Sequence, residues 1–139
     1  MIVFERSIKF EEVDAAGIVF FARFVNYAHE AMEHFFSHVP GGYPGLIMGR
    51  RIGFPAVHLD ASFASPVRFG DALRIETRVA RLGNRSAVFH YRMIHAASGA
   101  LASELRHTVV ASDLRTITSC DMPADVRALL VQHLEPGGP

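Results

Sequence analysis

The chain has 139 residues, of which half are hydrophobic and a fifth are charged. This length and composition predict a single folded domain over residues 1–139 with a sizeable core, and they exclude a disordered chain. Lys plus Arg and Asp plus Glu both number 14, so the formal net charge is zero. Because such a chain has no overall field to attract nucleic acid or an anionic membrane, neither is expected as a partner.

Cysteine usage and the apolar stretches bear on the cellular compartment. Cys120 is the only cysteine, which excludes an intrachain disulfide and fits a reducing, cytoplasmic location. Residues 1–6 lack a basic region followed by an apolar stretch, so no signal peptide is expected. The most apolar stretch, residues 17–28, is interrupted by Arg23 and Asn26 and is too short to span a bilayer.

The first half of the chain predicts a strand followed by a long helix. Residues 2–10 are rich in Val, Ile and Phe and predict a strand, and residues 11–18 predict a loop. From Phe21 onward, apolar residues recur every three and four positions, which predicts a helix with a wide apolar face that ends at residues 41–42, a Gly-Gly pair. Residues 45–54 fit a loop or short helix.

The second half of the chain predicts antiparallel strands. Alternating apolar and polar residues predict strands at 55–65, 71–81, 86–95 and 100–112, with a further short strand at 115–119. Residues 123–134 predict a short amphipathic helix, and the tail at 136–139 is expected to fray. A strand, a long apolar helix and then successive hairpins predict an α+β domain in which a curved antiparallel sheet wraps around the helix.

One carboxylate, Asp14, stands shortly before the predicted helix. The first amides of a helix point outward with partial positive charge and can hold a developing oxyanion. A nearby carboxylate can attack a carbonyl or activate water, and Gly17 lets the backbone approach a ligand. The same residues also fit a capping Asp and a turn glycine, so the spacing alone leaves both interpretations open.

Several segments, in chain order, resemble one known family. The stretch from Asp14 to Phe24, Asp-Ala-Ala-Gly-Ile-Val-Phe-Phe-Ala-Arg-Phe, resembles the signature of the 4-hydroxybenzoyl-CoA thioesterase family. Further similar segments are Gly53-Phe54-Pro55-Ala56-Val57, Ala61-Ser62-Phe63 with Asp71 after it, and Met122-Pro123-Ala124-Asp125. The resemblance covers most of the chain and implies a hot-dog fold and the hydrolysis of an acyl-CoA thioester.

The resemblance also implies roles for single residues. Asp14 matches the catalytic aspartate, described as a nucleophile or as a general base, and Phe21 falls where a backbone amide polarises the thioester carbonyl. Gly17 and Ile18 would line the approach to the site. Phe24 replaces a common Tyr of the relatives, so its ring contributes to an apolar lining.

The family comparison further implies contacts with the two ends of the substrate. Arg85 and Ser86 resemble a pair that contacts the phosphates of coenzyme A, although a solvated turn arginine is an equal alternative for Arg85. His29 stands where the hydroxybenzoyl enzyme has an acid, and Phe54 replaces a small polar residue. With Phe20, Phe54 would give a lining that suits an aromatic or other apolar acyl group.

Two other classes of function remain open beside the thioesterase. A non-catalytic module that binds acyl-CoA or an acyl carrier, and a hydratase or dehydratase, are both compatible with the same fold. His34 and His38 lie one helical turn apart, with Glu30 a turn before, a spacing that can bind zinc. No His-Glu-x-x-His pattern or Cys cluster accompanies them, so no metal or other cofactor is expected.

The predicted architecture also bears on assembly. A single sheet wrapped on one helix leaves edge strands and apolar patches, and the surplus of Phe in a small domain points the same way. We therefore expect a homo-oligomer, a dimer at least and a tetramer as the larger form, with active sites between subunits.

Overall fold

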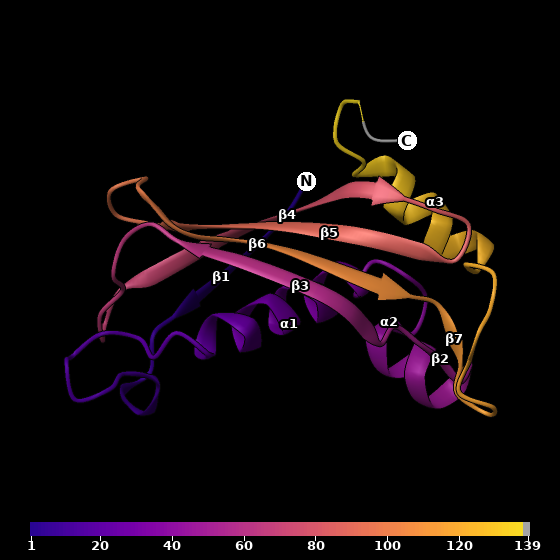
Figure 1. Ribbon diagram of the computed structural model, residues 1–139, viewed down its shortest axis with the longest axis horizontal. Coiled ribbons are helices and arrows are strands. Elements are labelled where there is room, and N and C mark those ends of the chain that lie inside the picture. The colour runs from indigo at the N-terminus through magenta and orange to yellow at the C-terminus, as the bar shows by residue number, and fades with distance from the viewer. Residues whose placement is uncertain (138–139) are drawn as a thin grey trace.

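The computed structural model describes residues 1–137 and consists of one sheet curved over one long helix (Figure 1). The five strands of the main sheet run in the order β1-β4-β5-β6-β3, and every neighbouring pair is antiparallel. Their bounds are β1 (Ile2–Ser7), β3 (Ala56–Phe63), β4 (Ala72–Leu82), β5 (Ser86–His95) and β6 (Leu101–Val110). The predicted α+β architecture is confirmed.

The remaining elements surround this sheet. The long helix is α1 (Arg23–Phe36), and α3 (Ala124–Gln132) packs beside β4 near the C-terminus. Shorter helical turns are η1 (Phe10–Glu12), α2 (Gly42–Pro44) and η2 (Gly45–Gly49). A small second sheet has the order β2-β7-β8, with β2 (Ile52–Gly53), β7 (Ser112–Asp113) and β8 (Thr118–Ser119). None of the described helices has the length and hydropathy that a membrane crossing requires.

The core lies between α1 and the inner face of the sheet. The apolar face of α1 is buried as predicted, and its Phe35 ring lies edge-on to Phe89 of β5 with centroids 5.2 Å apart. The inward residues of β4 and β5 are Leu73, Ile75, Thr77, Val79, Ala87, Phe89, Tyr91 and Met93, all buried. Because each large apolar side chain contributes roughly 1.5–3 kcal/mol when buried, this layer holds the helix against the sheet.

The first strand and the helix both differ from the sequence prediction at their ends. The strand predicted at 2–10 ends at Ser7, because the chain then turns into η1 to bury the side chain of Glu12. The helix predicted from Phe21 begins at Arg23, whose N–H donates to the carbonyl of Phe20 in a preceding turn. The apolar periodicity of the sequence therefore begins two residues before the regular helix.

The last strands are also divided more finely than predicted. The strand predicted at 100–112 breaks at Ala111, where the chain leaves the main sheet and the N–H of Ala111 donates to the carbonyl of Arg85 at 2.7 Å. The strand predicted at 115–119 is a turn, with Ile117 at φ 54°, followed by the two residues of β8. Of the tail predicted to fray, residues 138–139 lie outside the described part of the chain.

Candidate active site

The loop between β1 and α1 forms a small hairpin with Asp14 near its tip. Val13 and Val19 pair across its base, the N–H of Asp14 donates to the carbonyl of Ile18 at 2.9 Å, and the N–H of Gly17 returns to the carbonyl of Asp14 at 2.9 Å. Gly17 has φ +80°, a left-handed conformation that glycine adopts without strain. The predicted turn role of Gly17 and the exposed position of Asp14 therefore follow from one backbone geometry.

A buried ion cluster anchors the start of this hairpin. The guanidinium of Arg6 donates to both oxygens of Glu12 at 2.7 and 2.9 Å, and to Glu30 at 2.9 Å. The Tyr27 hydroxyl and the Lys9 amide also donate to Glu12, at 3.1 and 2.9 Å. Burial alone would raise the pKa of Glu12, but the hydrogen bonds from Arg6 and Lys9 outweigh it and lower that pKa to about 2. Glu12 is therefore ionised and holds β1, η1 and α1 together.

The carboxylate of Asp14 is exposed and only partly engaged. Its Oδ1 accepts the N–H of Ala16 at 2.8 Å, a local turn contact. Within residues 1–137, Oδ2 has no hydrogen-bond partner. The turn role of Asp14 and its availability for chemistry are therefore compatible, because the turn contact orients the side chain while one oxygen stays open.

The first amides before α1 are also open. The N–H of Phe20 donates to the carbonyl of Glu12 at 3.1 Å, which closes the base of the hairpin. For Phe21 and Ala22, no acceptor of their N–H groups lies within the described residues, and no side chain caps the helix. Unsatisfied donors at the positive end of a helix are suited to an oxyanion.

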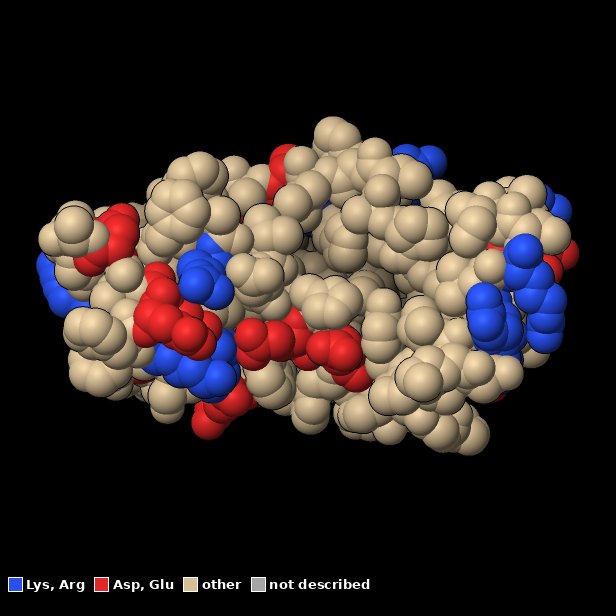
Figure 2. All heavy atoms as spheres, turned by 90° about the horizontal axis from the view of Figure 1, so that it is seen from below, with Lys and Arg blue, Asp and Glu red and all other residues tan. Residues whose placement is uncertain are grey.

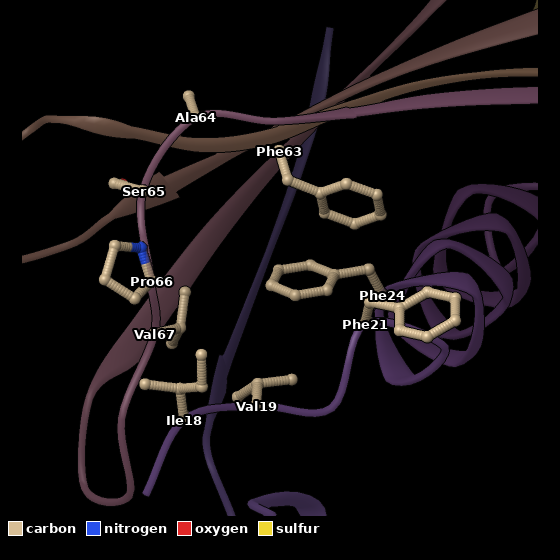
Figure 3. Close-up of a pocket in the computed structure, with 9 residues that line it drawn as sticks. All are labelled: Ile18, Val19, Phe21, Phe24, Phe63, Ala64, Ser65, Pro66 and Val67. Carbon is tan, nitrogen blue, oxygen red and sulfur yellow. The ribbon is translucent and has the colours of Figure 1, made fainter. Parts of the chain in front are cut away.

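An apolar cavity of about 280 Å³ opens beside these groups. Figure 3 shows its walls, with aromatic side chains on one side and the chain after β3 on the other. Its lining consists of Ile18, Val19, Phe21, Phe24, Phe63, Ala64, Ser65, Pro66 and Val67. The ring of Phe63 lies 5.4 Å from that of Phe24, so β3 and α1 together form the aromatic wall.

The two predicted phosphate contacts lie elsewhere in the chain. Arg85 and Ser86 are at the β4–β5 turn, beside α3, whereas the Asp14 hairpin lies at the opposite end of the sheet (Figure 1). The guanidinium of Arg85 pairs with Asp121 at 3.0 Å on the surface. A single chain thus does not bring Arg85 and Asp14 together.

Phe54 is placed in the core and not in the cavity beside Asp14. Its ring stacks on Phe36 with centroids 4.8 Å apart, and it is 5% exposed. The neighbouring Gly53 lies against the side chain of Leu114, where a Cβ atom would be only 2.7 Å from the Cδ2 atom of Leu114. The prediction that Phe54 lines the acyl site gains no support from this placement, because its ring is occupied by core packing.

The histidines considered for metal binding are held by aromatic packing. The rings of His34 and His38 lie 5.9 Å apart, and His34 also packs on Phe4 at 5.2 Å. Over residues 1–137, no three His, Cys, Asp or Glu side chains converge in a way that could hold an ion.

Sequence reasoning missed the ion cluster beneath the hairpin. Arg6 and Glu12 stand among other charged residues, with Glu5 and Glu11 directly beside them, so nothing in the local sequence singled them out as a buried pair. The pairing with Tyr27 could not be found, because it depends on how α1 turns its face toward β1. The wall formed by Ser65 and Val67 was also missed, since those residues follow a strand without any distinctive motif.

The comparison with protein families identifies the superfamily of this chain. A model of the thioesterase-like superfamily matches residues 8–130. The chain belongs to this superfamily. The curated relative 1,4-dihydroxy-2-naphthoyl-CoA hydrolase of Synechococcus sp. (strain CC9311) is 30% identical over 141 residues, which cover 95% of this chain and 93% of the relative.

Solved structures agree with this membership. A gentisyl-coenzyme A thioesterase superposes with a TM-score of 0.82 at 27% identity, over 92% of this chain and 98% of its own. A thioesterase superfamily member from Jannaschia sp. CCS1 gives 0.89 at 27% identity, over 97% and 94%. The predicted hot-dog fold and the predicted class, a thioester hydrolase, are confirmed for this thioesterase-like protein.

Proposed function

We propose that the protein hydrolyses the CoA thioester of an aromatic or other apolar acyl group, with Asp14 as nucleophile or general base and the Phe21 amide as oxyanion donor. The observation that carries the proposal lies in residues 14–22, just before α1. This short segment has open amides and an open carboxylate oxygen, and it lines one side of an aromatic cavity. Ile18, which pairs with Asp14 across the hairpin, also lines that cavity.

The chemistry follows from these groups. As the carboxylate of Asp14 attacks the carbonyl carbon, or takes a proton from a water that attacks it, negative charge develops on the carbonyl oxygen. The Phe21 N–H is already fixed to receive that charge, a contribution typically of about 3 kcal/mol. The C–S bond then breaks and the thiolate of coenzyme A takes a proton. On the general-base route the acyl carbon is already bonded to the water oxygen, so the acyl group leaves as its carboxylic acid. On the nucleophilic route it stays on Asp14 as a mixed anhydride, which a water molecule hydrolyses to the acid and the free Asp14 carboxylate.

The cavity supports an aromatic or apolar acyl group. Phe24 and Phe63 present ring edges and faces, and Gly17 leaves open space above the hairpin. The hydroxyl of Ser65 donates to the carbonyl of Leu101 at 2.7 Å and lies 3.0 Å from Nε2 of His95, so the wall that it belongs to is effectively apolar. The names of the relatives specify aromatic acyl groups, 1,4-dihydroxy-2-naphthoyl and gentisyl. We expect substrates of that general class because flat rings pack well against aromatic edges.

We further propose that the working unit is a dimer formed through β3. All eight residues of this edge strand are exposed, among them Val57 and Leu59. Identical edges related by a two-fold axis pair antiparallel, so the Arg85 end of one subunit would lie beside the Asp14 end of the other. That arrangement would supply Arg85 and Ser86 to the coenzyme A phosphates, and a tetramer would be two such dimers.

We also propose a cytoplasmic location for the protein. The only cysteine, Cys120, is half-buried, so the fold needs no oxidising compartment. Acyl-CoA thioesters are made and consumed inside cells. Detection of the native protein in a periplasmic or secreted fraction would contradict this part of the proposal.

A panel of CoA thioesters tests the function directly. Aromatic and straight-chain acyl-CoAs are assayed for release of free thiol, and an enoyl-CoA is assayed for addition of water. We expect thiol release with aromatic thioesters and no hydration. Thermal stabilisation by acyl-CoA without any turnover would favour a binding module instead, and hydration without thiol release would favour a hydratase.

The oxyanion donor has its own test. Phe21→Pro removes the backbone N–H at a position before the helix where Pro is tolerated, and Phe21→Ala removes the ring but keeps the N–H. We expect kcat to fall roughly 100- to 1,000-fold in the Pro variant relative to the Ala variant. Equal kcat in two folded variants would exclude the Phe21 amide as the donor.

A further inference from the structure

A second cavity of about 210 Å³ lies further along α1. Six residues from α1, β3 and β6 line it: Val25, Ala28, His29, Ala56, Leu59 and His107. Figure 2 looks at the molecule from the α1 side and shows it hollowed near the middle, with uncharged residues around the hollow and acidic side chains along one side. This cavity has two histidines in an otherwise apolar wall.

This cavity lies next to the first one, between the same strand and the same helix. Phe63 and Leu59 of β3 share the inner face of the sheet, as their cross-strand partners Ser103 and His107 do, so the same strand borders both cavities. Along α1, Phe24 borders the first cavity and His29 the second. At 1.5 Å per residue the two positions are about 8 Å apart along the helix axis, a distance that one acyl group can span.

The hydrogen bonding of His107 indicates which of its ring nitrogens carries the proton and can donate. Tyr91 is wholly buried, and burial raises its pKa well above the ordinary value, so the phenol keeps its proton. Its hydroxyl lies 3.5 Å from Nδ1 of His107, which is its one partner within the described residues. Because a buried hydroxyl needs an acceptor, Nδ1 accepts and the proton of a neutral His107 sits on Nε2.

The charge state of His107 and the charged residues near the cavity indicate which ligand groups the cavity can accept. Burial, and secondarily the neighbouring His29, lowers the pKa of His107, so the ring is neutral near pH 7. At the rim, His29 is half-exposed and lies 3.6 Å from the carboxylate of Glu33. A neutral donor at the floor and a carboxylate at the rim favour an uncharged oxygen over an anion.

We infer that His107 is a specificity-determining residue that donates a hydrogen bond to an uncharged oxygen, a hydroxyl or carbonyl, at the far end of the acyl group. This rests on the proposed thioesterase function, and it adds the polar group that the first cavity lacks. The second cavity is smaller than the roughly 300–1,000 Å³ of a site for a whole drug-sized ligand, so it suits one end of an acyl group and not coenzyme A.

The test compares substrates that differ by one oxygen. Benzoyl-CoA, the hydroxybenzoyl-CoA isomers and a carboxybenzoyl-CoA are assayed with the wild-type chain, His107→Leu and His107→Gln. In the wild type, kcat/KM is expected to be highest for one hydroxylated isomer and lowest for the carboxylate. In His107→Leu the preference for that isomer over benzoyl-CoA should fall roughly threefold to tenfold, the effect of one neutral hydrogen bond.

The Gln variant and a distant histidine serve as matched controls. His107→Gln keeps an N–H near the position of Nε2 and should retain most of the preference, whereas His38→Leu, at the far end of α1, should leave it unchanged. An undiminished preference in a folded His107→Leu variant overturns the inference.

A binding measurement separates this inference from the proposed function. In an Asp14→Asn background, the ratio of the dissociation constants for benzoyl-CoA and the preferred hydroxylated isomer is measured with and without His107→Leu. A ratio that collapses on loss of His107 supports the inference even if the chain shows no turnover, an outcome that would contradict only the hydrolase proposal. A ratio unaffected by His107 overturns the inference even in an active enzyme.

Discussion

The two edges of the main sheet differ in how far one chain completes them. At the β1 edge, Arg6 is 8% exposed and its guanidinium is paired with Glu12 and Glu30, so the strand is tied to both η1 and α1. At the β3 edge every residue is exposed, and Val57 and Phe63 are exposed by 62% and 51%. One edge is finished by internal ion pairs, and the other presents apolar side chains and unpaired backbone groups.

This difference assigns separate tasks to the two halves of the site. The hairpin with Asp14 grows from the β1 edge, so its position depends on contacts within the chain. Both cavities are bordered by β3, and Arg85 lies at the far end of the sheet, so we propose that the binding of a whole acyl-CoA depends on a second subunit. We expect mutations at the first edge to affect stability and mutations at the second edge to affect assembly.

The largest effect on stability is expected from breaking the ion cluster at the β1 edge. Arg6→Met leaves the Glu12 carboxylate buried without its guanidinium, which typically costs about 3–5 kcal/mol. The free energy of unfolding in urea measures this loss. The matched control is Arg50→Met, which breaks the exposed pair with Asp125 and should cost less than about 1 kcal/mol. Equal losses in the two variants would contradict the assigned role of the cluster.

The pH dependence of stability is a second test of the ion cluster at the β1 edge. The pKa of Glu12 is lowered to about 2 in the folded chain, against an ordinary value of 4.5, so its ionised form stabilises the fold above about pH 5. That contribution, up to about 3 kcal/mol, is lost as the pH falls from about 5 to about 2. Urea unfolding at several pH values should show that the free energy of unfolding falls more steeply with decreasing pH for the wild type than for Glu12→Gln. Parallel curves for the two proteins would argue against a stabilising role of ionised Glu12.

The β3 edge is tested by placing a charge on it. Val57→Asp puts a carboxylate on the exposed strand and should shift the protein from dimer to monomer in light scattering, with thioesterase activity reduced about tenfold or more because the groove is left incomplete. Val131→Asp on α3, where the valine is similarly exposed, should change neither property. A wild-type monomer with full activity would remove the need for the second subunit.

The smallest effect is expected at the end of the sheet that a partner would contribute. Arg85→Gln removes one surface cation near the proposed phosphate position, worth up to about 1 kcal/mol, so KM for acyl-CoA should rise up to about fivefold with kcat unchanged. The increase should shrink as salt is added, because exposed ion pairs are screened. A KM that does not change would leave Arg85 as a solvated turn residue paired with Asp121.

The sequence predicted those elements whose patterns are set by burial on one face. Strands β4 and β5 were found nearly residue for residue, because core residues recur at every second position from Leu73 to Val79 and from Ala87 to Met93. The turn η1 and the break at Ala111 were missed, since both arise where the chain leaves a sheet to satisfy tertiary hydrogen bonds. Periodicity carries no information on such departures.

The site was predictable only in part for a related reason. Asp14 and Gly17 were singled out by the family resemblance of residues 14–24, because their spacing alone fits a cap and a turn equally well. Phe54 was expected in the acyl lining, yet its ring packs on Phe36. That contact joins residues far apart in the sequence, so a local pattern could not predict it. His107 gave no local signal, because its place in the second cavity depends on the pairing of β6 with β3.

The most direct test of the account is the kcat of Asp14→Asn on the thioester that the wild-type enzyme hydrolyses best, with Asp125→Asn, an exposed aspartate on α3, as the control. Asp14→Asn should fold with an unchanged melting temperature, and the control, which weakens the exposed pair with Arg50, should lose less than about 1 kcal/mol of stability. Because the amide can act neither as base nor as nucleophile, we predict that kcat falls by about a hundredfold or more in Asp14→Asn and is unchanged in the control. Wild-type turnover by a folded Asp14→Asn variant would contradict the central claim.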